Sequence, residues 1–210
     1  MAELTTIFQE VWCQEQAPGD FKDEIIVKLY KWKENQQLCD NYRCISLLNI
    51  VKKIFTCTYL NGLNGCLEQG PLPESQFGFR RNHGNTDMGF AARQLQDKRQ
   101  EMRNHPSSNF VDLTKSFVTV NHDGLWKVMQ KFGCPERFTH IVRQLHDGMT
   151  ARVTDNGMAS EAFAVTNGVK QGCVMAPTLF SLIFSAMLMD AYRDEQPGIR
   201  VAYRTDGAEN

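Results

Sequence analysis

The sequence places a carboxylate, Asp112, at the end of an apolar run within "NFVDLTKSFVTVNH", residues 109–122, with Phe117 five positions further on. Carboxylate oxygens are the hard ligands that Mg²⁺ prefers, and phosphoryl transfer uses divalent metals that bridge the attacking and leaving oxygens. The end of a strand suits such a ligand because the sheet holds its oxygen in place. Taken alone, an exposed acid that closes a turn is the more ordinary interpretation of Asp112.

Basic side chains in "YKWKENQQLCDNYR", residues 30–43, could contact an anionic substrate. Lys31 would supply a point charge to a phosphate, and Arg43 would supply a bidentate guanidinium. Lys28 and Lys33 lie close to Lys31 in sequence, so the choice among the lysines stays open. A solvated basic strand face is the competing interpretation of all of them.

A glycine loop, "KQGCVMAP" at residues 170–177, precedes a strongly apolar segment. Gly172 has no side chain, so the backbone next to Gln171 could approach a ligand closely. The alternative is a plain loop that leads into a helix.

The elements that must position these residues follow from hydrophobic periodicity and from turn signals. A hairpin at 151–165 is predicted by Asn156-Gly157, because both residues tolerate a positive φ. The helix at 86–103 is expected to turn Met88, Phe90, Ala91, Ala92 and Leu95 inward. Further helices are expected near 4–12, 47–68, 122–133, 135–148 and 177–195, and strands at 23–33, 44–48, up to Asp112, and at 198–207.

Composition sets the general class of protein. The chain has 210 residues, 42% of them hydrophobic, which is enough for a packed core, and its formal net charge of -1 indicates no global positive field. Seven cysteines without a C-x-x-C pair are interpreted as reduced, mostly buried thiols. The N-terminus resembles neither a signal peptide nor a membrane anchor. We therefore expect an intracellular protein, cytoplasmic or nuclear, with no membrane partner.

Four motifs occur in a characteristic order along the chain: "NYRCISLL", "LPESQFGFRRNHGNTD", "FVDLTKSFVTVNHDGLW" and "NGVKQGCVMAPTLFS". This order resembles the fingers and palm of a reverse transcriptase, specifically that of the non-LTR, LINE-type retrotransposon polymerases. The resemblance spans residues 20–207. It implies an α+β fold in which an antiparallel palm sheet packs on helices, with an N-terminal helix at 1–20, fingers at 21–105 and a partial palm at 106–210 in one continuous domain.

The resemblance also implies a role for each candidate residue. Asp112 matches the family's metal-binding aspartate, with the carbonyl of Leu113 as an additional ligand, and Phe117 matches the bulky residue that blocks a 2′-hydroxyl on the incoming sugar. Lys31 and Arg43 match triphosphate contacts, and Gln171 and Gly172 match the pair that approaches nucleotide and template. The implied partners are Mg²⁺, an RNA template, a DNA primer and deoxynucleoside triphosphates, and Arg80 and Arg81 would touch the template backbone.

Two departures from the family pattern affect the expected activity. Val118 stands where the family usually has an aspartate, and the aspartate pair of the family's "ADD" hairpin does not occur before Asn210. Asp190 and Asp206 are unpaired in the sequence and cannot replace that pair. We therefore expect a fragment, truncated before the catalytic hairpin, that is inactive alone because one carboxylate cannot hold two metals.

Two other interpretations remain open. The chain could be a noncatalytic nucleic-acid-binding remnant of a retroelement that keeps the fold and the basic hairpin, although the near-neutral net charge favours only weak binding. It could also be a remnant without a selected role, in which case an open sheet edge would favour aggregation.

Overall fold

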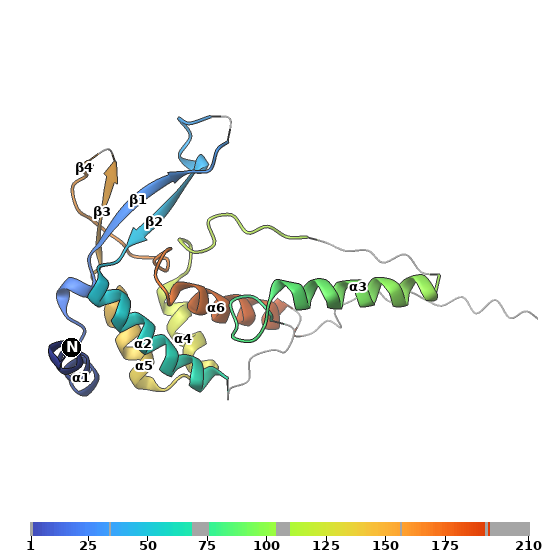
Figure 1. Ribbon diagram of the computed structural model, residues 1–210, viewed down its shortest axis with the longest axis horizontal. Helices are drawn as coiled ribbons and strands as arrows, with labels where there is room; N and C mark the ends of the chain where they lie inside the picture. Colours follow the sequence, from blue (N-terminus) through green and yellow to red (C-terminus); the bar gives the residue numbers. More distant parts are fainter. Residues whose placement is uncertain are drawn as a thin grey trace, which may run out of the picture.

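A computed structural model describes residues 2–33, 35–68, 76–103, 110–155, 157–191 and 193. Figure 1 shows a small sheet standing above a group of packed helices, with one long helix, α3, projecting away from that group. The sheet and the packed helices meet at the glycine loop that precedes α6. Gln171 and Gly172 belong to this loop.

The sheet is mixed rather than purely antiparallel. Its order is β2-β1-β3-β4, with β5 also paired to β3. β1 and β2 form an antiparallel hairpin, whereas β1 and β3 run parallel, with Ile25 opposite Arg152. The strands are β1 (Glu24–Tyr30), β2 (Tyr42–Leu47), β3 (Thr150–Asp155), β4 (Met158–Ala159) and β5 (Phe163–Ala164).

Asparagine side chains cap the start of α2 and of α4. The side chain of Asn49 accepts a hydrogen bond from Lys52 N at the start of α2, and Asn121 accepts one from Gly124 N at the start of α4. The α-helices are α1 (Ala2–Gln14), α2 (Ile50–Leu67), α3 (Asn85–Glu101), α4 (His122–Lys131), α5 (Glu136–His146) and α6 (Ala176–Ala191), and short 3₁₀ turns lie at η1 (Gly19–Phe21) and η2 (Cys39–Asn41).

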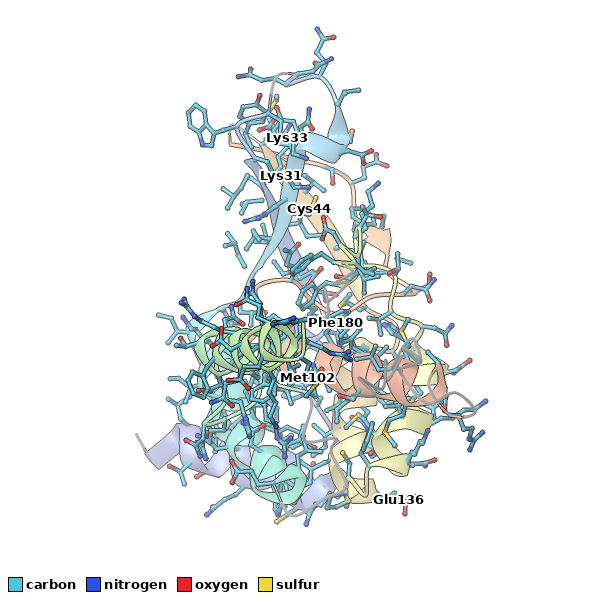
Figure 2. The ribbon with its side chains drawn as sticks, turned by 90° about the vertical axis from the view of Figure 1, so that its right-hand side faces the viewer. Lys31, Lys33, Cys44, Met102, Glu136 and Phe180 are labelled. Atoms are coloured by element: carbon cyan, nitrogen blue, oxygen red, sulfur yellow. The ribbon has the colours of Figure 1, made fainter. Side chains whose placement is uncertain are left out.

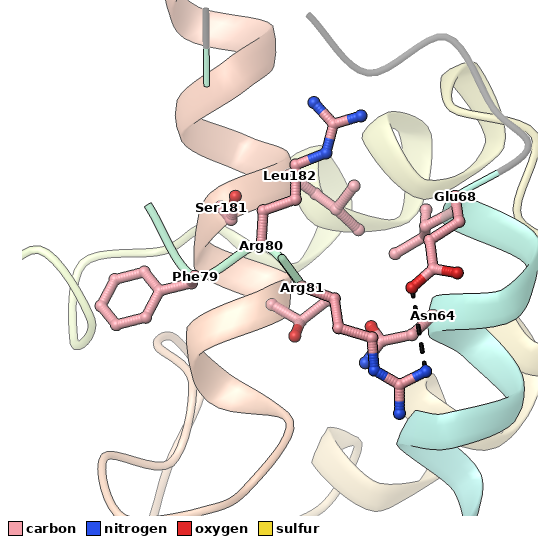
Figure 3. Close-up of a pocket in the computed structure, with 9 residues that line it drawn as sticks. Asn64, Glu68, Phe79, Arg80, Arg81, Ser181 and Leu182 are labelled. Atoms are coloured by element: carbon pink, nitrogen blue, oxygen red, sulfur yellow. Dashed lines mark ion pairs between the residues drawn. The ribbon is translucent and has the colours of Figure 1, made fainter. Parts of the chain in front are cut away.

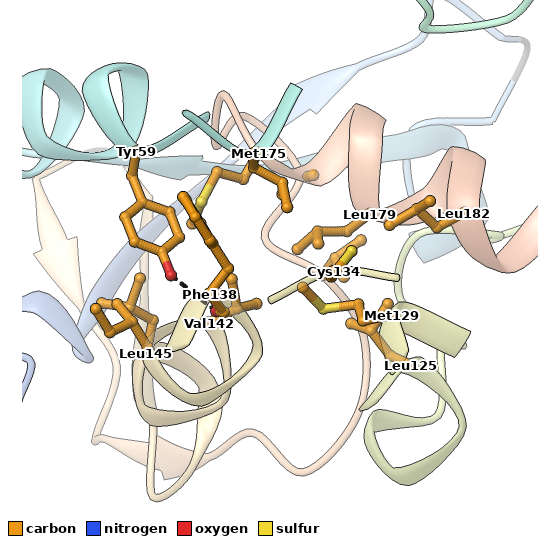
Figure 4. Packing of buried hydrophobic residues seen from close by; sticks show 14 of the residues in the cluster. Tyr59, Leu125, Met129, Cys134, Phe138, Val142, Leu145, Met175, Leu179 and Leu182 are labelled. Carbon is orange, nitrogen blue, oxygen red and sulfur yellow. Dashed lines mark hydrogen bonds between the residues drawn. The ribbon is translucent and has the colours of Figure 1, made fainter. Parts of the chain in front are cut away.

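The core lies between α2, α4, α5 and α6, where α4 packs against both α5 and α6. Figure 4 shows Met129 and Leu125 of α4 facing Leu179 of α6. The core also holds the hydroxyl of Tyr59, which has a hydrogen-bond partner: it donates to the carbonyl of Phe138 over 2.8 Å. This helical base is the framework on which the candidate site is built.

The predicted helices and the β1–β2 hairpin are confirmed, but the strand expected to end at Asp112 is not. Residues 110–113 adopt no strand, and Phe110 is 96% exposed. A strand needs a partner for its backbone groups, and the described residues offer this segment none. The strand expected at 198–207 and the turn residue Asn156 lie outside the described residues.

The inward face predicted for α3 is also wrong. No side chain of α3 is buried, and Met88, Phe90 and Leu95 are exposed. Apolar periodicity buries a face only when another element packs over it, and no described element does so here. The prediction of mostly buried cysteines is wrong as well, because Cys134 and Cys173 alone among the described thiols are buried.

Candidate active site

Asp112 and Leu113 line a cavity of about 480 Å³ against α6. The α6 side chains Phe180, Ile183 and Met187 supply its apolar wall, and the loop at 114–120 and the start of α4 complete the lining. Asp112 is exposed, so its carboxylate is accessible to solvent and to a ligand. The arrangement places one acidic group in the lining of a largely apolar hollow.

Phe117 is held beside this cavity by two other rings. It stacks on Phe180 with ring centroids 4.8 Å apart and an interplanar angle of 30°, and it meets Phe79 edge-on at 6.2 Å. Offset-stacked and edge-to-face pairs are the favoured aromatic geometries. The ring therefore has a defined position five residues after Asp112, on the same side of α6.

Backbone hydrogen bonds tie the Phe117 segment to the two residues just before the glycine loop. Val169 N donates to Phe117 O over 2.8 Å, and Gly168 N donates to Val120 O over 2.7 Å. At Gly168, φ is +91°, and a Cβ there would lie 2.9 Å from the Cα of Val118. This close approach requires glycine at position 168. Backbone contacts therefore position Val118, and its side chain is exposed.

The glycine loop itself is joined to the edge of β2. Ser46 N donates to Gln171 O over 2.7 Å. Gly172 has φ +109°, and a Cβ at that position would lie 2.7 Å from Ser46 O. A side chain would therefore both strain the backbone and push the loop away from the strand.

Lys31 and Arg43 lie on the β1–β2 hairpin, as Figure 2 shows for Lys31 near its tip. The Lys31 ammonium donates to Asp40 O over 2.9 Å, and Lys115 pairs with the Asp40 carboxylate at 2.7 Å. Lys115 holds the pKa of Asp40 below its usual value through this hydrogen bond and its charge. Asp40 thus connects the hairpin tip to the loop that carries Asp112.

The predicted site residues fall into three groups in the described structure. Asp112, Leu113 and Phe117 share the face of α6, Gln171 and Gly172 pack on β2, and Lys31 and Arg43 extend along the hairpin. The cavity at Asp112 is lined by none of the last four residues. The groups are connected through Asp40 and through the backbone contacts of residues 168–172.

A buried charged cluster next to the glycine loop was not predicted from the sequence. Lys170 and Lys52 are both almost fully buried beside Glu24, and their ammonium groups donate to Lys22 O and Asp23 O at 2.8 and 3.1 Å. Burial, together with the charge of Lys52, lowers the pKa of Lys170 to about 7, whereas burial raises the pKa of Glu24. Lysines are seldom buried, so no local sequence pattern predicts this cluster. It depends on contacts between residues that are 29 and 148 positions apart in the sequence.

Comparison with known proteins identifies the family. The model of the family described as "Reverse transcriptase (RNA-dependent DNA polymerase)" matches residues 31–201. The chain belongs to the reverse transcriptase family. The chain is 30% identical over 186 residues to the RNA-directed DNA polymerase from mobile element jockey of Drosophila melanogaster, covering 88% of the chain and 20% of that relative.

Other relatives place this reverse transcriptase among those of the LINE type. A probable RNA-directed DNA polymerase from transposon X-element of Drosophila melanogaster is 27% identical over 85% of the chain and 20% of its own length. The chain therefore spans about a fifth of these relatives. Apo telomerase from Candida tropicalis, truncated from its C-terminal domain, shares the fold with a TM-score of 0.55 and 12% identity, over 91% of this chain and 44% of that one.

The reverse transcriptase family uses divalent metals, but the described residues do not provide a complete metal site. They contain no group of three or more His, Cys, Asp or Glu side chains arranged to hold an ion. Asp190 pairs with Lys131 at 3.3 Å, and Asp206 lies outside the described residues. Asp112 therefore stands as a single carboxylate, which does not fit a two-metal centre by itself.

Figure 3 shows the "GFRR" segment between α2 and α6. Phe79, Arg80 and Arg81 lie beside Ser181 and Leu182, and line a small pocket with them. Arg81 lies 3.8 Å from the Glu68 carboxylate and also reaches the side chain of Asn61, so its charge is partly used within the fold.

Among the helices described here, none has the length and apolar content needed to cross a membrane.

Proposed function

We propose that this chain is the part of a retrotransposon polymerase that positions template and nucleotide for template-directed nucleotidyl transfer. Its family acts on nucleic acid, and the proposed ligands are an RNA template, a DNA primer and deoxynucleoside triphosphates. The observation that carries the proposal is the grouping of Asp112 and Phe117 on one face of α6, within the segment that matches the family.

Each residue has a proposed role in this reaction. Asp112 and the carbonyl of Leu113 would provide part of a Mg²⁺ site, with the remaining ligands coming from outside the described residues. The ring of Phe117, fixed against Phe180, would limit the space beneath the incoming sugar. Its stacking on Phe180 supports this role because a packed ring has a defined position from which to act as a steric barrier.

The basic and glycine residues would act on the other end of the nucleotide. Arg43 and Lys31 would contact the triphosphate, and the backbone at Gln171 and Gly172 would approach the base pair. The positive φ of Gly172 and its contact with β2 support a loop with a fixed backbone. We propose residues 21–105 as fingers and 106–210 as partial palm of one continuous domain, supported by the pairing of β1 with β3 across this boundary.

The proposal predicts no polymerase activity for the chain alone, because its one placed carboxylate cannot hold two metals. A test joins the chain to the aspartate-pair hairpin and thumb of the jockey polymerase and measures primer extension on RNA with Mg²⁺ or Mn²⁺. We expect extension by the joined protein only. Asp112→Asn should abolish it, whereas Asp123→Asn, which alters an exposed acid in the first turn of α4, should preserve it.

Two results would contradict the proposal: extension that survives Asp112→Asn, or a folded joined protein that is silent. Salt-dependent RNA binding that survives Asp112→Ala but weakens with Arg43→Ala, without extension, would instead favour the noncatalytic binding remnant. An intracellular location, cytoplasmic or nuclear, belongs to the same proposal, because a retroelement polymerase meets its nucleic acids there.

A further inference from the structure

The tip of the β1–β2 hairpin carries three aromatic rings in succession. Tyr30 and Tyr42 lie opposite each other in the strand register, with ring centroids 5.4 Å apart, and Trp32 lies 5.8 Å from Tyr30. The Trp32 side chain is 90% exposed. An exposed indole grouped with two further rings forms an aromatic surface that a ligand could cover.

These rings do not belong to the proposed triphosphate contacts. Side chains alternate between the faces of a strand, so Tyr42 and its neighbour Arg43 point to opposite sides of β2. The register places Arg43 across from Leu29 and Tyr42 across from Tyr30. The rings therefore form a surface separate from the Arg43 face. We call Tyr30, Trp32 and Tyr42 the tip ladder.

The backbone around the tip ladder is fixed by hydrogen bonds. Lys31 N donates to Asn41 O over 2.8 Å, and the Lys31 ammonium donates to Asp40 O. The hydroxyl of Tyr42 donates to Gln36 O over 2.9 Å. Trp32 itself has φ +56°, which is uncommon for a bulky residue and is maintained by these contacts. The indole is thus presented from a set backbone position rather than from a loose loop.

Positive charge is interleaved with the tip ladder. The Lys28 ammonium lies 5.6 Å from the centre of the Tyr42 ring and pairs with Asp155, and Lys33 directly follows Trp32 in the sequence. Residues 28–43 contain four basic and two acidic residues, in a chain whose formal net charge is -1. Aromatic rings with ammonium groups nearby match a ligand that combines flat bases with phosphates.

We propose that the tip ladder is a stacking site for unpaired bases of single-stranded nucleic acid, with Trp32 as its principal contact. The inference rests on the proposed function in one respect, since a template strand is the single-stranded ligand that such a domain handles. The binding itself involves neither Asp112 nor a metal, so it can be tested without catalysis.

The test measures binding of the full chain to a fluorescent oligothymidylate of about twelve nucleotides and to an abasic oligomer with the same phosphates, in EDTA. The wild type should bind the oligothymidylate roughly tenfold more tightly, which corresponds to one stacked base. Trp32→Ala should remove most of this preference, and Trp32→Phe, which keeps a ring, should retain most of it.

Two control variants separate stacking from charge and from general damage at the tip. Lys33→Gln should weaken binding to both oligomers and reduce the slope of log affinity against log salt by about 0.7, the value for one phosphate contact on a single strand. Leu38→Ala removes another exposed apolar side chain near the same tip and should change neither quantity. Thermal melting followed by circular dichroism checks that each variant is folded.

The proposal is wrong if the wild type does not prefer the oligothymidylate over the abasic oligomer, including the case in which it binds neither. It is also wrong if folded Trp32→Ala keeps the preference, or if Leu38→Ala loses it to the same degree. Silence in the primer-extension assay, with the base preference intact, would remove the polymerase proposal and leave the stacking site standing.

Discussion

The helical base and the β1–β2 hairpin bury their apolar residues to very different degrees. In the base, Leu63, Leu125, Met129 and Ile141 are completely inaccessible to solvent, whereas exposed side chains along the hairpin include Leu29. The base is held by packing, while the hairpin is held by strand pairing and by polar contacts at its tip. Packing therefore contributes most of the stability in the base, whereas the hairpin carries exposed side chains.

The strongest test of this contrast removes a buried side chain from the base. Met129→Ala should lower the free energy of unfolding by about 2–5 kcal/mol, because the cavity left behind adds to the lost transfer free energy. Leu95→Ala in exposed α3 is the matched control and should change it by less than about 0.5 kcal/mol. Urea unfolding followed by circular dichroism measures both. Equal effects would show that the base is not held by packing of its buried side chains.

A second test uses pH, because burial lowers the pKa of His146 to about 3, helped by the charges of Lys170, His122 and Lys52. Its Nδ1 lies 2.8 Å from Val142 O. The unfolded chain takes up a proton at this histidine near pH 6.5 and the folded chain does not, so stability should fall as pH decreases from 6.5 toward 3.

The matched variant for this test is His146→Asn, which can keep the donor to the Val142 carbonyl but cannot titrate. Relative to it, the wild type should lose up to about 1.4 kcal/mol of stability per pH unit below 6.5. Denaturant unfolding at several pH values gives both curves. Parallel curves would indicate that His146 is protonated, or accessible to water, in the folded protein.

The junction between base and hairpin should show an intermediate effect. Gly172→Ala should cost about 1–3 kcal/mol, because φ is +109° and the new Cβ would meet Ser46 O at 2.7 Å. Gly65→Ala is the control: it meets no atom within 4 Å and lies in α2, so it should stabilise the protein by about 0.5–1 kcal/mol. Thermal unfolding distinguishes the two signs, and a neutral Gly172→Ala would mean that the loop is not held against β2.

The smallest perturbation is chemical labelling of the thiols. Cys39 and Cys44 lie exposed on the hairpin side of the molecule, whereas Cys134 is buried and burial raises its pKa to about 11. Iodoacetamide at neutral pH should therefore modify the first two quickly and Cys134 only after denaturation, as mass spectrometry of peptides would show. Rapid modification of Cys134 would reveal that the base opens more readily than its packing indicates.

The sequence predicted those elements whose information is local. The periodicity of apolar residues located α2, α4, α5 and α6, and the motif order predicted the family that the comparisons confirm. The roles of Asp112, Phe117 and Arg43 stay predictions until the reaction is measured. The motifs did not predict that these residues would lie in separate groups. That placement depends on contacts between segments far apart in the sequence.

The features that the sequence could not reveal depend on distant partners. The apolar periodicity of α3 is the same whether or not another element packs on that face. The exposure of Met88 and Leu95 could therefore not be predicted from it. The parallel pairing of β1 with β3, and the burial of Lys170 beside Glu24, join segments that no short-range pattern relates. Turn signals and periodicity report on a few neighbouring residues, whereas these contacts join segments far apart in the sequence.

The pairing of β1 with β3 has a consequence for how the protein is made. Asp23 and Thr150, which hydrogen-bond beside this pairing, are 127 residues apart, so at about 5–20 residues per second a ribosome needs on the order of ten seconds to supply the second strand. During that time one edge of the nascent hairpin is unpaired and open to other chains. Chaperones that bind extended segments during translation would therefore affect the yield of folded protein more than they affect its final stability.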